Sequence, residues 1–553
     1  MIEDLSFKKL KPVIIVLIVF ICLSGIVMRF YRITKMDFVF YDEGYYLNFS
    51  RYFYERLILQ YPDNFKDMTM FIWYWLKLSL ATGKALWFLM SDARVFFGAY
   101  HFWPFPRVLA AIAGTLSLGL VYLFAKRLYR SKAIGILSVV LLAIMPSHVF
   151  YSRLGMQETF STLCFLSGFY FYLFPRKLSW RTFLAGVFFA GAWFTNYRLI
   201  TLPAHIAFCE LILSVSEKRW PDLRKYIWCV LTFFFFIFMV GNLDNGNNTV
   251  IVFAWIFYQS NLAKEQFDLF NFFSFPYYLF RLENFFFGLL FFANIYHLVK
   301  KQWIRALPFG LAFLHMFIYS FAGEKGARYL CVVSPFLVMA VASLIVYLGK
   351  DAKQKFVRVG IGIISLLLVV GFYIKSVKIT KSRSGYQKVA EYLLAKDRNV
   401  KFIATQNYVF SLFTKRWQDV APFPYKFRKF MSLYGQGYRY LVIGPQAYVS
   451  FVRDMKRFDT ELFDFIEFVY AKIKPIAEFD HFDDVMLERF VFDHNENLKR
   501  SLNFLKTNDG SYGKLRVFDI AHILGWLDRA IGLKNIKLNP EYKPHHPFEK
   551  YGR

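Results

Sequence analysis

Long apolar runs separated by short basic turns fill the first 380 or so residues of the chain. A spanning helix needs about 20 mostly apolar residues to cross about 30 Å of hydrocarbon, and several runs reach or approach that length without an internal charge. We expect about eleven crossings, at Pro12–Met28, Pro106–Phe124, Ala133–Phe150, Phe160–Phe174, Thr182–Phe194, Leu199–Val215, Trp228–Val240, Asn284–Val299, Ala306–Phe321, Cys331–Leu348 and Val359–Tyr373. The pattern therefore predicts an α-helical, polytopic membrane protein.

The pattern changes twice along the chain. Residues 30–105 form a long aromatic segment whose amphipathic start is typical of helices that lie flat at the membrane surface. From about residue 379 the charge becomes mixed, with one helix-like and three strand-like runs: Tyr386–Lys396, Val400–Thr405, Tyr438–Ile443 and Phe465–Ala471. We expect a transmembrane domain at residues 1–378, which includes the interfacial segment, and a soluble α/β domain at residues 379–553.

The distribution of Lys and Arg predicts the orientation. Five hairpins would face the cytoplasm if the N-terminus does, and they carry eighteen Lys and Arg, whereas the turns on the other side carry far fewer. Cytoplasmic loops of membrane proteins are enriched in these residues. With an odd number of crossings, we expect a multi-pass plasma-membrane protein with a cytoplasmic N-terminus and an extracytoplasmic C-terminal domain.

Composition refines this picture in two ways. The net charge of +29 would suit nucleic acid, but the basic residues cluster between apolar runs, where they meet anionic lipid. We therefore predict the lipid bilayer, and no nucleic acid, as a partner. All five cysteines lie in apolar runs without paired spacing, which indicates neither a disulfide framework nor a zinc site.

Two acidic positions stand out near the predicted outer face. Asp42 and Glu43 open the amphipathic segment, where they either act at the membrane surface or cap that helix, because acidic residues favour a first helical turn. Glu158 begins an otherwise apolar helix, and an ionisable group there is costly unless it is paired or hydrated. Arg153 is close enough in sequence to be its ion-pair partner, which is the alternative to a functional role.

A basic position follows on the same face. Lys325 and Arg328 precede the run that starts at Cys331. Cationic side chains together with the N–H groups of a helix start bind phosphate well, although Lys and Arg also anchor helices at the interface. An acid pair, a further carboxylate and a cationic cradle on one face would together form a site for transfer from a phosphate-linked donor.

In order and spacing these residues resemble the polyprenyl-phosphate-dependent membrane glycosyltransferases of the GT-C fold, specifically the protein O-mannosyltransferase and lipid A aminoarabinose transferase group. The matching positions are Asp42-Glu43 with Tyr46, Arg107, Ser152-Arg153 with Glu158, residues 191–198 with Pro203, and Lys325 with Arg328-Tyr329 and Pro335. Where many relatives carry Lys after the fifth run, this chain has Asn196-Tyr197-Arg198, so that the basic role passes to Arg198 or is absent.

The resemblance implies transfer of a sugar from a polyprenyl-phosphate-linked donor to an acceptor hydroxyl, with inversion. Asp42 would be the general base, Glu43 would assist it, and Glu158 would orient a cation or the acceptor. The donor phosphate would contact three cations, Arg153, Lys325 and Arg328. Three further residues would line the site, namely Tyr46, Arg198 and Tyr329. A lipid phosphate is a good leaving group, so no metal or other cofactor is predicted, although a divalent ion would be compatible with the chemistry.

Two other readings of the sequence stay open. A transporter, or a lipid-handling membrane protein without transferase activity, would place polar residues near the midplane and often shows repeated halves, whereas here they cluster at one rim. A relative that transfers a whole oligosaccharide would usually need an acidic metal-binding motif. The pair Asp42-Glu43 keeps this alternative open. The sequence leaves the acceptor undecided between a protein, a lipid and a glycan.

Overall fold

The computed structural model describes most of the chain: residues 12–35, 37–52, 84–94, 104–174, 177–243, 268–414, 417–424, 426–444, 473–493, 497–507 and 514–531, with isolated positions 76, 79, 254, 256–258, 260, 261 and 469. Its contacts define two compact units, one of residues 1–34, 56–381 and 496–498, the other of residues 35–55, 382–495 and 499–553. The division after Lys381 lies close to the expected boundary at residue 378. Residues 35–55, which the sequence assigned to the transmembrane domain, group instead with the second unit.

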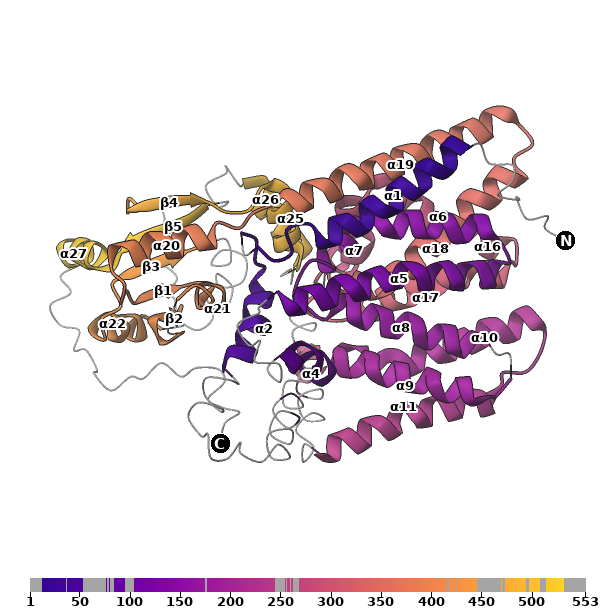
Figure 1. Ribbon diagram of the computed structural model, residues 1–553, viewed down its shortest axis with the longest axis horizontal. Coiled ribbons are helices and arrows are strands. Elements are labelled where there is room, and N and C mark those ends of the chain that lie inside the picture. The colour runs from indigo at the N-terminus through magenta and orange to yellow at the C-terminus, as the bar shows by residue number, and fades with distance from the viewer. Residues whose placement is uncertain are drawn as a thin grey trace. The chain divides into compact units, whose positions relative to one another are not determined.

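The first unit is a bundle of helices (Figure 1). Its elements up to α10 are α1 (Pro12–Phe30), α4 (Ala85–Asp92), α5 (Phe105–Tyr129), α6 (Lys132–Ile144), α7 (Pro146–Tyr151), α8 (Glu158–Leu173), α9 (Trp180–Thr195), the 3-10 turn η5 (Tyr197–Thr201) and α10 (Leu202–Glu217). The remaining ones are α11 (Leu223–Leu243), α13 (Leu269–Phe272), α14 (Ser274–Tyr278), the π turn η6 (Leu279–Glu283), α15 (Phe285–Phe292), α16 (Ile295–Val299), α17 (Trp303–Ser320), α18 (Tyr329–Asp351) and α19 (Lys355–Lys381). Each of the predicted apolar runs overlaps one or more of these helices.

Length and composition allow six helical segments of the described part to cross a membrane: Pro12–Phe30, Phe105–Tyr129, Tyr197–Glu217, Trp303–Ser320, Tyr329–Asp351 and Lys355–Lys396. This confirms the α-helical polytopic class, whereas the number of crossings stays a prediction. Helix α18 is the core of the bundle, since 89% of its most apolar window is buried, against 17% for α1 and 11% for the segment that contains α19. Most of the surface of α1 and α19 is therefore left uncovered by protein, as expected for helices that face lipid, and the two helices lie side by side (Figure 1).

The predicted run Ala133–Phe150 is divided into α6 and α7. Met145 has an extended backbone (φ −64°, ψ 120°), and Pro146 is the first residue of α7. Proline has no N–H group, so the carbonyl four residues earlier loses its helical donor. Inside a membrane such a carbonyl needs another partner.

Side chains of α1 and α19 supply these partners. Arg29 of α1 donates from Nη2 to the carbonyl oxygen of Leu142 (3.0 Å) and from Nη1 to that of Ala143 (2.7 Å). The hydroxyl of Ser376 in α19 donates to the carbonyl oxygen of Ile144 at 2.8 Å. Three consecutive carbonyls at the helix break are therefore satisfied by residues distant in sequence.

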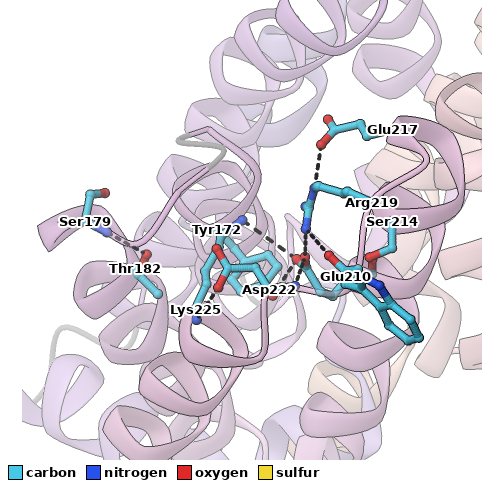
Figure 2. A network of polar contacts seen from close by, with 10 residues as sticks. Tyr172, Ser179, Thr182, Glu210, Ser214, Glu217, Arg219, Asp222 and Lys225 are labelled. Atoms are coloured by element: carbon cyan, nitrogen blue, oxygen red, sulfur yellow. Dashed lines mark hydrogen bonds and ion pairs between the residues drawn. The ribbon is translucent and has the colours of Figure 1, made fainter.

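A second polar network lies at the α10–α11 hairpin, where donors from α8, from α11 and from the turn between α10 and α11 surround the buried carboxylate of Glu210 (Figure 2). Its Oε2 accepts from the Tyr172 hydroxyl at 3.0 Å, and its Oε1 accepts from the backbone N–H of Asp222 at 2.9 Å. Arg219 Nη1 lies 2.9 Å from Oε1. Lys225 Nζ lies 4.0 Å from Oε2 and 4.0 Å from the centre of the Tyr172 ring. This network holds the hairpin against α8.

The second unit is an α/β domain. Its elements are α2 (Tyr41–Tyr52), α20 (Tyr386–Lys396), β1 (Phe402–Ala404), α21 (Asn407–Phe410), the 3-10 turn η7 (Trp417–Asp419), β2 (Val420–Pro422), α22 (Phe427–Gly435), β3 (Tyr440–Ile443), β4 (Ala477–Asp480), α25 (Asp484–Asp493), α26 (Leu498–Thr507), β5 (Lys514–Asp519) and α27 (Ile520–Ile531), with the first residue of α26 counted in the first unit. This confirms the predicted C-terminal α/β domain. The predicted strand Phe465–Ala471 lies almost entirely outside the described residues.

The sheet has the strand order β2-β1-β3-β5-β4 (Figure 1). Strand β1 is parallel to β2 and β3, and β5 is antiparallel to β3 and β4. Because successive side chains of a strand point to opposite faces, Ile403 packs in one core with Phe430, and Phe402 packs in another with Tyr386. Helices therefore cover both faces of the sheet.

Residues 35–55 belong to this second unit through local hydrogen bonds. The backbone N–H of Val39 donates to the Ser384 hydroxyl at 3.1 Å, and the N–H of Ser384 donates to the carbonyl of Asp37 at 2.8 Å. The side chain of Asn48 in α2 donates to the carbonyl oxygen of Tyr408. These bonds fix the start of α2 in the second unit.

Candidate functional site

The predicted acidic pair occupies the first turn of α2, in the second unit. Glu43 is buried, and its Oε2 accepts the backbone N–H of Phe40 at 3.2 Å. Glu43 is the third residue of α2, and Phe40 immediately precedes the helix. A carboxylate at the third position that accepts the N–H of the residue before the helix is one half of a capping box. The structure thus gives Glu43 the capping role that the sequence left as an alternative. Asp42 is half-buried, and Tyr46 is buried one turn further along α2.

Glu158 is the first residue of α8, in the first unit, and only 1% of its surface is exposed. Neither carboxylate oxygen has a hydrogen-bond partner among the residues that the structure describes. Three cations act on the carboxylate electrostatically, with Arg328 first, followed by Lys84 and Arg198. The structure therefore places Glu158 in a cationic group of Arg328, Lys84 and Arg198, and its ion pair with Arg153 stays a prediction.

One of these cations, Arg198, lies against two aromatic rings. The Arg198 guanidinium lies 4.8 Å from the centre of the Tyr329 ring and 5.9 Å from that of Tyr197. Arg198 also interacts electrostatically with Arg328 and with Glu324. Arg198 and Arg328 are both buried. Stacking on an aromatic face holds a guanidinium in one plane, which suits recognition of phosphate or carboxylate oxygens.

Arg328 is the residue that precedes α18, so that its backbone lies at a helix N-terminus as the sequence predicted. Lys325 lies in the loop before it and is buried. Its Nζ donates to the carbonyl oxygen of Ala322 at 2.6 Å, and its own carbonyl accepts from the Tyr278 hydroxyl at 2.9 Å. Burial lowers the pKa of Lys325 to about 8. A group with this pKa changes charge close to physiological pH.

Arg153 contacts backbone carbonyls at the ends of two helices. Its Nη1 donates to the carbonyl oxygens of Met28 and of Tyr31 (2.8 Å), and its Nη2 lies 3.5 Å from the carbonyl oxygen of Thr380. These carbonyls belong to the C-terminal ends of α1 and α19, where a cation is favoured by the helix dipole. Arg153 thus joins these two helix ends, and its contact with a phosphate stays a prediction.

Three charged residues of the first unit were not predicted from the sequence. Lys84 immediately precedes α4, and Asp92 and Arg94 lie at the end of that helix, where both are buried. Burial raises the pKa of Asp92 to about 7, although Arg94 acts in the opposite direction. The only signal in the sequence was a Lys directly before the apolar stretch that starts at Ala85, inside a segment treated as interfacial.

Metal binding is not assigned. Among the residues described, no three His, Cys, Asp or Glu side chains come together in a way that could hold a metal ion. That no metal is required therefore stays a prediction.

The helical bundle, the small α/β unit and the acid–cation group define a polytopic membrane protein with the fold of the GT-C glycosyltransferases, as predicted. Residues 85–243 match the profile of the family described as dolichyl-phosphate-mannose-protein mannosyltransferase. This stretch contains Arg153, Glu158 and Arg198, whereas Asp42 and Lys325 lie outside it. No curated protein matches the chain at the level of sequence.

Solved structures share the fold. The structure of ArnT from Cupriavidus metallidurans bound to undecaprenyl phosphate has a TM-score of 0.51 and 14% sequence identity, and the match covers 79% of this chain and 94% of that one. The oligosaccharyltransferase of Archaeoglobus fulgidus in complex with Zn and sulfate has a TM-score of 0.50 and 11% identity, with 79% and 69% of the two chains covered. At these identities the likeness establishes the fold.

Proposed function

We propose that this protein is a membrane glycosyltransferase that transfers a sugar from a polyprenyl-phosphate-linked donor to an acceptor hydroxyl. The observation that carries the proposal is the buried carboxylate of Glu158 beside three cations, Arg328, Lys84 and Arg198, in a bundle of the GT-C fold. The match to a mannosyltransferase family over residues 85–243 and the undecaprenyl phosphate bound to ArnT both support a lipid-phosphate donor.

The leaving group of such a reaction is a polyprenyl phosphate, which gains negative charge as its bond to the sugar breaks. Preorganised cations stabilise this charge best in a site that excludes water. Arg328 and Arg198 supply two permanent charges, Lys84 supplies a further cation, and Lys325 supplies one whose pKa burial lowers to about 8. In this proposal Glu158 keeps the cations in place by balancing their charge before the donor binds.

The acceptor hydroxyl attacks C1 of the sugar from the face opposite the phosphate. The bond from C1 to the phosphate oxygen breaks, the hydroxyl proton passes to a carboxylate base, and the configuration at C1 inverts. We assign the base to Asp42, and to Glu43 the task of fixing the start of α2 on which Asp42 stands. Tyr46 and Tyr329 are proposed as further residues of the site.

The proposed orientation follows the distribution of Lys and Arg. The N-terminus and the Glu210 network would face the cytoplasm, and the Glu158 group and the second unit the outside of the plasma membrane. Lipid-linked donors of this kind have an insoluble carrier, so the reaction takes place at the membrane surface. The acceptor stays open between a protein, a lipid and a glycan.

The test is release of polyprenyl phosphate from polyprenyl-phosphate-linked sugars, in membranes that contain the wild-type chain or Asp42→Asn at equal protein level. Release in the wild type that falls by about a hundredfold or more in Asp42→Asn would support both the activity and the base, since general-base catalysis contributes about 10²–10⁴-fold. Equal release in both would remove Asp42 from the mechanism.

A second pair of variants tests the cationic group independently of the base. Arg328→Gln is expected to weaken donor binding, and Arg358→Gln, which removes a cation from the first turn of α19, serves as the matched control. No release above empty membranes with monosaccharide or oligosaccharide donors would contradict the proposal and favour a transporter.

A further inference from the structure

The N-terminal end of α8 carries four buried polar atoms without hydrogen-bond partners in the described part of the protein. They are the amide oxygen and nitrogen of Gln157, which is fully buried, and the two carboxylate oxygens of Glu158. The hydroxyls that follow on the same helix are satisfied. Thr159 donates to the carbonyl oxygen of Ala110 at 3.0 Å, and Thr162 donates to that of Glu158 at 2.8 Å. Within this stretch of α8 and its N-cap, the lack of partners is therefore confined to Gln157 and Glu158.

Such an arrangement is costly in a protein without a ligand. Each buried polar group without a partner costs about 1–3 kcal/mol, and few of them occur in native structures. Gln157 also precedes the helix without capping it, since its side chain accepts no backbone N–H. Two neighbouring residues of this kind point to polar groups of a ligand that complete their hydrogen bonds.

The chemistry of the pair indicates what those groups are. A carboxylate accepts hydrogen bonds only, whereas an amide both donates and accepts. Each hydroxyl of a sugar ring also donates and accepts, so neighbouring hydroxyls match an amide beside a carboxylate. A phosphate alone would be repelled by Glu158. It finds its partners instead in Arg328, Lys84 and Arg198, which act on the same carboxylate.

We propose that Gln157, together with Glu158, binds hydroxyl groups of the sugar that is transferred, while the adjoining cations bind the phosphate to which this sugar is attached. This inference rests on the proposed function and names the part of the donor that the end of α8 recognises. The donor is favoured over the acceptor because its C1 is bonded to a phosphate oxygen, which places its ring beside the cations. Gln157 then acts as a specificity-determining residue and takes no proton.

The experiment compares the binding of four lipids to the purified full-length chain in nanodiscs: polyprenyl phosphate without a sugar, and the same lipid carrying mannose, glucose or arabinose. The wild type is expected to bind at least one glycosylated lipid about tenfold more tightly than the bare lipid, which corresponds to about 1.4 kcal/mol. In Gln157→Leu this advantage is expected to disappear, while affinity for the bare lipid stays unchanged. Thr162→Val, which removes a satisfied hydroxyl from the same helix, is the matched control.

Unchanged affinity for the bare lipid also demonstrates that Gln157→Leu is folded. A deoxy series of the preferred sugar then identifies the contact. Removal of one hydroxyl should weaken binding to the wild type but not to Gln157→Leu, as expected for two groups that interact directly.

An undiminished advantage of the glycosylated lipid in Gln157→Leu would overturn the inference. So would a variant that binds all donors normally but has a raised KM for the acceptor, because the pair would then recognise the acceptor. If the wild type binds neither bare nor glycosylated lipid, the proposed function itself fails.

Discussion

The hydroxyl of Tyr172 in α8 donates to the carboxylate of Glu210 in α10 at 3.0 Å, and the ammonium of Lys225 lies above the same tyrosine ring. Lys225 is fully buried, and its ion pair with Glu210 spans 4.0 Å. Its positive charge therefore depends on one carboxylate and one aromatic ring.

We expect Glu210→Ala to destabilise the protein by about 3–5 kcal/mol, the usual cost of leaving a buried charge without its partner. Thermal unfolding in detergent would measure the effect. The double variant Glu210→Ala/Lys225→Met should recover part of the loss because it removes the charge as well. An equal loss of stability in the single and double variants would mean that the Coulomb interaction between Lys225 and Glu210 is unimportant.

Lys325 predicts a dependence of donor binding on pH. Burial lowers the pKa of Lys325 to about 8, so its charge is present at pH 7 and mostly lost at pH 9. If this charge assists phosphate binding, the KM for the donor should rise about tenfold between pH 7 and pH 9. Lys325→Arg keeps its charge throughout and should give a flat profile. A wild-type KM that does not change over this range would exclude the role of Lys325.

His481 predicts acid sensitivity of the second unit. Its Nδ1 lies 2.6 Å from the carbonyl oxygen of Ser384 and therefore carries the proton, which leaves Nε2 to accept from the Tyr386 hydroxyl at 3.3 Å. Burial lowers the pKa of His481 to about 3. In the unfolded chain a histidine has a pKa of about 6.5. The contribution of neutral, buried His481 to the stability of the second unit is therefore fully present above pH 6.5 and is lost as the pH falls from about 6.5 towards 3.

Hydrogen exchange in the peptides around Ser384 and His481 should therefore accelerate between pH 6.5 and pH 4.5, after correction for the intrinsic rate. The His481→Asn variant should be less stable than the wild type at pH 7.5. On acidification, however, its stability should fall by less than that of the wild type. Parallel pH profiles for the two proteins would contradict this assignment.

Gly385 precedes α20 with a φ of +67°, and a Cβ added there would collide with the carbonyl oxygen of Asp480. Gly437 also has a positive φ, of +93°, but nothing lies within 4 Å of its added Cβ. Gly437→Ala should lower the free energy of unfolding by about 1–2 kcal/mol, because its backbone is left-handed. Gly385→Ala should cost more, because the collision adds to the same strain.

Urea unfolding of the second unit, followed by hydrogen exchange in the full chain, would compare these two variants. Gly435→Ala, a position without positive φ or close neighbours, provides the baseline. Equal costs for Gly385→Ala and Gly437→Ala would show that the backbone moves away from the Cβ.

Hydropathy anticipated the helices because lipid requires an apolar side chain at nearly every exposed position. It did not anticipate the break between α6 and α7, since the residues around Pro146 are as apolar as the rest of the run. The proline was visible in the sequence. The donors that make its break tolerable, Arg29 and Ser376, belong to helices more than a hundred residues away on either side.

The site illustrates the same limit. Glu158 was recognisable because it is a carboxylate that opens an apolar helix. Its neighbours were not, because proximity in sequence favoured Arg153, whereas the fold brings Lys84, Arg198 and Arg328 to it from three other elements. Glu43 could equally be a cap or a functional acid, and only the position of the Phe40 N–H assigned the cap.

The helix break also constrains how the chain is made. The carbonyl of Ile144 receives its hydrogen bond from Ser376, which is synthesised 232 residues later. At about 5–20 residues per second, a ribosome needs on the order of 10–50 s to reach that serine. Throughout this interval the carbonyl of Ile144 lacks the donor that it has in the folded chain, so that the final packing of the α6–α7 break waits for the arrival of α19.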